Sequence, residues 1–413
     1  MIVPSIDLQG GQTVQLVGGA EKALDAGDPL PIAERFSVAG ELAVIDLDAA
    51  MRKGSNAGLI ERLVAKFPCR VGGGIRDVHT AVGWLDKGAA KVILGTMAVP
   101  EILSQLPTER VIAALDARDG EVVVQGWTER TGRALLERIG ELKDFVGGFL
   151  VTFVEREGRL GGTDMELAKA VVAAAGSARV TIAGGVTTSE EIAALDRLGA
   201  DAQVGMALYT GRLDLADAIM APLVSDRPDG LFPTVVTDER GLALGLVYSS
   251  RESIRQAVAR RMGIYQSRSR GLWVKGETSG ATQELLRIEL DCDRDSPRFV
   301  VRQTGAGFCH LDTRTCWGED AGLSRLERTL RQRRDQAPAG SYTAKLFADP
   351  ALLGAKLREE ADELVRAETR DEVIWEAADV LYFTLARLAA DGVDLAEVEA
   401  HLDARALKVT RRG

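Results

Sequence analysis

The sequence has few of the features that mark secreted, membrane or nucleic-acid-binding proteins. Only four of its 413 residues are cysteines, too few for a disulfide framework. No apolar run approaches the roughly 18 residues of a membrane span, and the N-terminus lacks the basic region of a signal peptide. A net charge of −10 argues against sequence-independent binding to nucleic acid. We therefore expect a cytoplasmic protein that binds neither membranes nor nucleic acid.

The composition is that of a globular protein, with 46% hydrophobic and 27% charged residues. Residues 1–224 alternate short apolar runs with helical stretches, which predicts a (β/α)8 TIM barrel. A segment rich in proline (221–233) indicates a linker. Residues 225–320 show alternating strands and polar turns, and residues 321–413 are strongly helical. The predicted fold is multidomain: a barrel, then a mainly β (α+β) domain, then an all-α domain.

The barrel segment contains an internal repeat, in which residues 71–99 resemble residues 181–209. This repeat indicates a duplicated half-barrel. Its matching glycines are Gly73, Gly74 and Gly95 in the first half and Gly184, Gly185 and Gly205 in the second. Backbone N–H groups that follow such glycines can bind anions at a helix N-terminus. The repeat therefore predicts two phosphate sites on opposite rims; the alternative is that the glycines only allow tight turns.

Two aspartates follow matching apolar runs of the repeat. Asp7 and Asp116 are expected to face each other at the catalytic end of the barrel. Opposed carboxylates of this kind can divide the roles of general acid and general base.

The motifs VPSIDLQGG (3–11), VGGGIR (71–76), ALDARDGEVVVQGW (114–127) and VGMALYTG (204–211) resemble the histidine-pathway ProFAR isomerase. That enzyme converts the N-glycoside ProFAR to the ketose PRFAR by an Amadori rearrangement. The resemblance implies that Asp7 is the base at the ribose, that Trp127 closes over the substrate and that the glycine sets hold the two phosphates.

The barrel departs from the family pattern at four positions, one of which is Met206, where the family has arginine. Gln15 stands where the family usually has arginine, and Phe153 and Glu157 stand where it usually has two aspartates. Glu157 would take the acid role with its carboxylate moved by one methylene, and a misplacement of about 1 Å can cost roughly 100-fold in rate. Two alternatives follow: a non-catalytic scaffold barrel, or a barrel that also isomerises phosphoribosylanthranilate.

The middle segment combines aspartates and cysteines. The run ELLRIEL has the alternation of a strand, and it is followed by Asp291, Cys292, Asp293, Arg294 and Asp295. If the strand continued, the three aspartates would lie on one face and Cys292 on the other. Carboxylates on one face suit a hard cation. The alternative is a solvated acidic turn.

Cys309 and Cys316 complete a C-x16-C-x6-C pattern with Cys292. Three thiolates with an open fourth position are typical of a catalytic zinc site, and His310 could move a proton there. The alternative is three buried structural cysteines.

The motifs LGLVYSSRESI (244–254), YQSRSRGLWVKGETSG (265–280), LDCDRD (290–295) and GFCHLDTRTCW (307–317) closely resemble phosphoribosyl-AMP cyclohydrolase. That enzyme opens the adenine ring of PR-AMP to give ProFAR. The resemblance implies Zn²⁺ on the three cysteines, Mg²⁺ on the three aspartates, and ligands from two subunits, hence a homodimer through this domain. The basic residues expected to bind substrate phosphate are Arg268, Arg270 and Lys275. An exposed basic loop is the alternative.

The helical segment places Glu360 and Glu363, and then Glu376 and Asp379, three residues apart on helix faces. Two such pairs can hold Mg²⁺ against a triphosphate; salt-bridged surface helices are the alternative. With SYTAKLF (341–347), the pattern resembles phosphoribosyl-ATP pyrophosphohydrolase. That resemblance implies Mg²⁺-assisted hydrolysis of PR-ATP to PR-AMP and pyrophosphate.

The three resemblances predict consecutive reactions on small phosphoribosyl nucleotides, in a chain order that reverses the reaction order. The middle and last segments also resemble the fungal multifunctional histidine enzyme. One alternative is a bifunctional enzyme whose barrel is only a scaffold. Another is a nucleotide-sensing or metal-storage protein, which predicts tight binding without turnover.

Overall fold

The computed structural model describes residues 1–18, 21–124, 127, 129–269 and 271–410. The chain forms two compact units. The first comprises Met1–Gly305 together with the residues from Leu407 onward, and the second comprises Ala306–Ala406.

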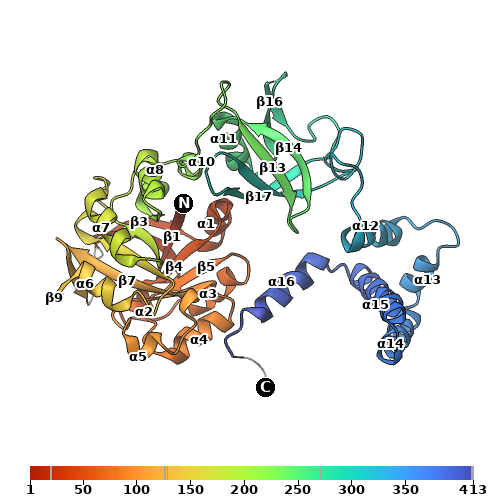
Figure 1. Cartoon of the computed structure of the whole chain (residues 1–413), viewed down its shortest axis with the longest axis horizontal. Coiled ribbons are helices and arrows are strands. Elements are labelled where there is room, and N and C mark those ends of the chain that lie inside the picture. The colour runs from red at the N-terminus through yellow and green to blue at the C-terminus, as the bar shows by residue number, and fades with distance from the viewer. Residues whose placement is uncertain (19–20, 125–126, 128, 270, 411–413) are drawn as a thin grey trace. The chain divides into compact units, whose positions relative to one another are not determined.

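The first unit begins with the predicted barrel (Figure 1). Each strand pairs in parallel with its neighbours, and β10 pairs with both β7 and β11, which closes the ring. All six residues of β10 are buried, as expected for a parallel strand covered on both faces. The eight strands are β1 (Ile2–Gln9), β4 (Leu42–Asp46), β5 (Cys69–Gly72), β6 (Lys91–Leu94), β7 (Val111–Arg118), β10 (Gly148–Phe153), β11 (Arg179–Ala183) and β12 (Ala200–Val204).

Helices cover the outside of the barrel (Figure 1). They are α1 (Pro29–Phe36), α3 (Ala57–Val64), α4 (Val78–Asp86), α5 (Pro100–Leu103), α6 (Leu135–Leu142), α7 (Met165–Ala175), α8 (Ser189–Arg197) and α10 (Leu215–Met220), with the one-turn helices α2 (Leu47–Ala50) and α9 (Met206–Tyr209). Side chains of the chain itself cap several of them. Asp77 accepts an N–H group in the first turn of α4, and Thr188 and Glu191 form a capping box on α8.

The internal repeat is visible in the hairpins that follow the first and fifth strands of the barrel. β2 (Gln12–Val17) and β3 (Glu21–Gly27) extend β1, and β8 (Glu121–Val124) and β9 (Glu129–Ala134) extend β7. Each half therefore opens with the same antiparallel extension, as a duplicated half-barrel predicts.

The rest of the first unit is mainly β. Its four-stranded sheet has the order β14-β13-β18-β17, in which only the central β13–β18 pair is parallel. A helix and a two-stranded hairpin accompany the sheet. These elements are β13 (Phe232–Asp238), β14 (Ala243–Ser249), α11 (Arg251–Arg260), β15 (Ile264–Ser267), β16 (Gly271–Val274), β17 (Gln283–Leu290) and β18 (Pro297–Gln303).

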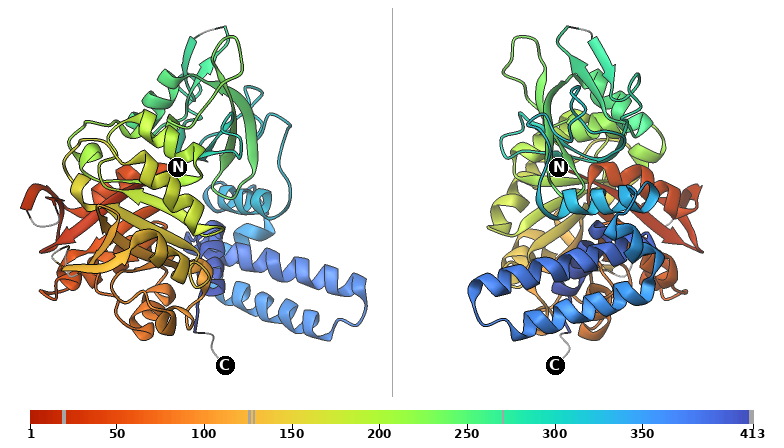
Figure 2. Two further views of the ribbon diagram at one scale, coloured as in Figure 1. Left: turned by 60° about the vertical axis from the view of Figure 1, so that its left-hand side comes forward. Right: turned by 90° about the vertical axis from the view of Figure 1, so that its right-hand side faces the viewer.

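The second unit is helical after an irregular segment, and α14 and α15 lie side by side as a hairpin (Figure 2). Its helices are α12 (Gly322–Asp335), α13 (Tyr342–Ala348), α14 (Pro350–Arg366), α15 (Arg370–Asp391) and α16 (Leu395–Ala406). Leu330, Leu346, Leu353 and Phe383 form much of its buried core. None of the helices in the described part of the chain is both long enough and apolar enough to cross a membrane.

The segment after α16 returns to the first unit and packs on the barrel. The N–H group of Val409 donates to Asp86 at the end of α4, over 2.7 Å. The guanidinium of Arg110 donates to the carbonyl oxygen of Leu407. These contacts explain why the last residues belong to the first unit.

Candidate active sites

Three carboxyl groups converge at one end of the barrel, because the carboxyl ends of parallel strands meet there. Asp7 lies near the end of β1, Asp116 lies near the end of β7, and Glu157 follows β10. Burial, together with the nearby charges of Asp7 and Asp116, raises the pKa of Glu157 to about 8. The sequence predicted two of these acids as an opposed pair and the third from the family resemblance.

Asp7 and Glu157 differ in protonation. Burial raises the pKa of Asp7 to about 6, and the hydroxyl of Ser5, which donates to Oδ1 over 2.9 Å, acts in the opposite direction. At pH 7 Asp7 is therefore mostly ionised, whereas Glu157 is mostly protonated. This split is the arrangement that a base and an acid need in the same site.

Asp116 is held by two side chains. Burial raises its pKa, while hydrogen bonds from Trp127 and Thr152 oppose that rise. Thr152 lies directly opposite Asp116 in the pairing of β7 with β10. No sequence pattern predicted a role for Thr152 or Ser5. Ser5 lies two residues before Asp7 on the same strand, and that spacing puts both side chains on one face.

Gln15 lies between the Asp7 carboxylate and the second glycine set. Its amide Nε2 is 3.0 Å from the carbonyl oxygen of Val14 and 3.5 Å from Asp7 Oδ2. A Cβ atom at Gly205 would lie 2.4 Å from Gln15 Oε1. The position where the family usually has arginine therefore carries a buried amide in contact with the Asp7 carboxyl group.

The two glycine pairs have the same backbone geometry. Gly73 and Gly184 have φ values of 91° and 90°, a region that favours glycine. A Cβ atom would lie 2.2 Å from the carbonyl oxygen of Asp46 at the first position and 2.5 Å from that of Phe153 at the second. Both turns therefore require glycine for close approach to the preceding strand.

The N-termini of the helices after these pairs are already occupied, since α4 and α8 are capped by their own side chains. Of the predicted anion-binding glycines, Gly205 itself is the N-cap of a helix, the one-turn α9. Phosphate binding by the six glycines therefore stays a prediction that depends on their loop N–H groups.

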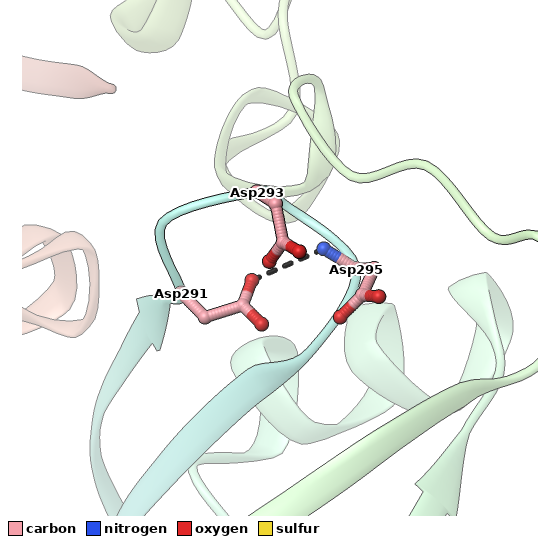
Figure 3. A group of neighbouring side chains, drawn as sticks. All are labelled: Asp291, Asp293 and Asp295. Atoms are coloured by element: carbon pink, nitrogen blue, oxygen red, sulfur yellow. Dashed lines mark hydrogen bonds between the residues drawn. The ribbon is translucent and has the colours of Figure 1, made fainter.

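The three aspartates of the middle segment converge, but not for the predicted reason. β17 ends at Leu290, so Asp291, Asp293 and Asp295 lie in the turn between β17 and β18 and not along a strand. Carboxylate oxygens of the three lie within 4.8 Å of one another (Figure 3). Asp291 Oδ1 accepts the N–H group of Asp295 over 3.1 Å, which curls the turn. Alternation between faces was the wrong explanation, because the chain reverses direction there.

The three cysteines are divided between the two units. Cys292 is exposed in the aspartate turn, whereas Cys309 and Cys316 belong to the second unit. The backbone N–H group of Leu311 contributes most to lowering the pKa of Cys309, and a hydrogen bond with Cys316 adds to it. His310 Nδ1 is 3.9 Å from Cys309 Sγ. A lowered pKa favours the thiolate, the form that binds zinc.

The three basic residues expected to bind phosphate have different surroundings. Lys275 is buried, and its ammonium group donates to the carbonyl oxygen of Ala281 over 2.9 Å. Arg268 is exposed, with its guanidinium 5.1 Å from the centre of the Tyr248 ring. Arg270 lies outside the described residues. Of the two described residues, Arg268 is the one accessible to a ligand.

The helical unit brings three of its four predicted acids together. Carboxylate oxygens of Glu360 and Glu363 on α14 and of Glu376 on α15 lie within 4.8 Å of one another. Burial and the charges of Glu363 and Glu360 raise the pKa of Glu376. Asp379 is outside this group, but its charge also raises the pKa of Glu376. Glu376 Oε2 is buried without a hydrogen-bond partner among the described residues, as expected for a cation ligand.

Three family models match the chain in succession. The model described as "Histidine biosynthesis protein" matches residues 1–214, slightly more than half of the chain. The chain belongs to this family. The model of phosphoribosyl-AMP cyclohydrolase matches residues 245–318, and that of phosphoribosyl-ATP pyrophosphohydrolase matches residues 323–406.

Relatives of the chain carry corresponding names. A phosphoribosyl imidazole-4-carboxamide isomerase of Haloarcula marismortui is 42% identical over 237 residues, which cover 53% of this chain and 95% of the relative. A "Histidine biosynthesis trifunctional protein" of Neurospora crassa is 40% identical over 82% of this chain and 37% of its own length. The "Histidine biosynthesis bifunctional protein his7" of Schizosaccharomyces pombe is 55% identical over 49% of this chain and 48% of its own length. The chain thus spans about half or less of the two fungal relatives.

Proposed function

We propose that this chain catalyses three consecutive steps of histidine biosynthesis. It hydrolyses PR-ATP to PR-AMP and pyrophosphate, opens the adenine ring of PR-AMP to give ProFAR, and isomerises ProFAR to PRFAR. The observation that carries the proposal is that each segment matched by a family model has its own cluster of acids or thiols suited to its step.

In the barrel, Asp7 acts as the base that removes a proton at the ribose of ProFAR. Glu157, protonated near neutral pH, donates a proton to the ring oxygen as the sugar opens. Asp116, held by hydrogen bonds from Thr152 and Trp127, is the third carboxyl group of the site. The glycine sets hold the two phosphates at either rim.

In the middle domain, the aspartate turn fits a hard cation such as Mg²⁺, because its three carboxylates already lie together. Zn²⁺ would be held by three thiolates, which are soft ligands, from Cys292, Cys309 and Cys316. Zinc supplies a hydroxide-like nucleophile near neutral pH when it is bound. His310, beside Cys309, moves a proton, and Arg268 binds the substrate phosphate, with Arg270 and Lys275 completing the predicted basic group.

In the helical domain, Glu360, Glu363, Glu376 and Asp379 would hold Mg²⁺ against the triphosphate of PR-ATP. The orphaned buried oxygen of Glu376 fits this role. We infer domain boundaries at residues 1–224, 225–320 and 321–413, and a homodimer through the cyclohydrolase domain in which two subunits contribute zinc ligands.

The deciding experiment is steady-state turnover of purified ProFAR by the intact protein, with Asp7→Asn as the control. We expect turnover that is lost in the variant. Absence of turnover, with PR-ATP still converted to ProFAR, would make the barrel a scaffold and the protein bifunctional. Tight binding of PR-ATP with no conversion at all would leave a nucleotide-sensing protein.

The same preparation tests a second substrate of the barrel. Phosphoribosylanthranilate is assayed under identical conditions, and isomerisation that also disappears in Asp7→Asn would assign both reactions to one site.

A further inference from the structure

Arg294 lies in the aspartate turn, between Asp293 and Asp295. Its φ is 67°, a left-handed conformation that is unfavourable for residues other than glycine. Its carbonyl oxygen accepts the N–H group of Val224, over 2.8 Å, from the segment that follows the barrel. An arginine in this position would be the nearest cation to three carboxylates.

The guanidinium of Arg294 binds the barrel instead. Its Nε and one terminal nitrogen donate to the two carboxylate oxygens of Asp196, over 2.9 and 3.0 Å, in a bidentate pair. Asp196 lies on α8 and also accepts a hydrogen bond from the amino group of Met1. The other terminal nitrogen of Arg294 donates to the backbone carbonyl oxygen of Asp291.

The three carboxylates of the turn are therefore not neutralised by Arg294. Among the residues that the structure describes, Arg294 forms no ion pair with Asp291, Asp293 or Asp295. An arginine paired with these groups would oppose a bound cation, since like charges a few ångströms apart repel strongly near a protein surface.

We propose that Asp196 of the barrel is a positioning residue for the cation site of the middle domain, because it holds the Arg294 guanidinium away from the three carboxylates. The barrel then contributes to the ring-opening step as well as to its own reaction. This inference rests on the proposed function, which assigns a divalent cation to the aspartate turn.

The test measures Mn²⁺ binding to the full chain by electron paramagnetic resonance. All variants carry Glu363→Gln, so that the helical carboxylates do not contribute to the signal. Asp196→Asn should weaken Mn²⁺ binding about tenfold, because it releases a positive charge toward the site. Adding Arg294→Gln to Asp196→Asn should restore the affinity to within about twofold of the parent. A purely structural role for Asp196 would give no such rescue.

The chain offers a matched control in the pair of Arg255 with Asp217, whose atoms are 2.7 Å apart. This pair also joins a barrel helix to α11, and Asp217→Asn should leave Mn²⁺ binding unchanged. Binding in Asp196→Asn equal to the parent, or a double variant as weak as Asp196→Asn, would overturn the inference. If Asp293→Asn binds Mn²⁺ as well as the parent does, the cation site itself is wrong, which is a separate failure of the proposed function.

Discussion

Glu157 is the residue on which the chemistry of the barrel depends most. Asp7 is ionised above about pH 6, and Glu157 is protonated below about pH 8. As the pH increases, kcat/KM for ProFAR should therefore rise near pH 6 and fall near pH 8. Glu157→Gln should lower kcat by roughly 10²- to 10⁴-fold and remove the falling limb. The measurement is a pH–rate profile of both proteins.

The control for this profile is Glu155→Gln, two residues away, which should keep both limbs. A falling limb that survives in Glu157→Gln would give the acid role to Asp116, whose pKa burial also raises.

Glu157 also predicts a pH dependence of stability. Its folded-state pKa of about 8 lies above the usual 4.5, so its favourable contribution is present below pH 4.5 and is lost as the pH rises through 8. At pH 9, Glu157→Gln should therefore have a larger free energy of unfolding than the parent, by at most about 5 kcal/mol, and a higher unfolding temperature. Both differences should shrink toward pH 5. Thermal melts across this range test the sign; a variant less stable at pH 9 would contradict it.

At the scale of elements, the glycine turns allow a matched comparison. Gly184 and Gly199 have φ values of 90° and 85°, but only at Gly184 would a Cβ atom meet a carbonyl oxygen, 2.5 Å away. Gly199→Ala should cost about 1–2 kcal/mol for the left-handed backbone alone. Gly184→Ala should cost about 3 kcal/mol or more, since steric contact adds to the same strain.

Chemical unfolding of the two alanine variants, followed by circular dichroism, measures this difference. Equal decreases in the free energy of unfolding would mean that the close approach of Gly184 to β10 does not contribute to the cost of the substitution.

The elements of the barrel could be predicted because their signal is local. Continuous apolar runs such as β10 indicate buried parallel strands, and Asp7 could be placed at the catalytic end of the barrel because it lies near the end of β1. The aspartate turn could not be predicted from local sequence. Three alternating acids are typical of a strand, but the strand ends at Leu290 and the chain turns after it. No local pattern could have paired Arg294 with Asp196, because 98 residues separate them.

For the whole molecule, the three activities should be separable by single substitutions. Glu363→Gln removes one of the three helical carboxylates and should lower pyrophosphate release from PR-ATP by about 100-fold or more. Conversion of added PR-AMP to PRFAR should be unchanged, because that variant leaves the thiols and the barrel acids intact. Coupled assays with PR-ATP and with PR-AMP measure both rates.

The matched control is Glu359→Gln, which removes a neighbouring acid that pairs with Lys356 over 2.9 Å but lies outside the three-carboxylate group. It should leave pyrophosphate release nearly unchanged. Equal loss of both activities in Glu363→Gln would indicate that the helical carboxylates support the fold of the chain rather than one reaction.

The return of the chain to the barrel after α16 affects which fragments a protease can release. Residues 306–406 are continuous with the first unit at both ends, and beyond them Asp86 and Arg110 bind the returning segment. A protease that cuts once within the irregular segment before α12 therefore leaves the helices joined to the barrel through their other end. Only a second cut, after Ala406, yields a fragment that can diffuse away.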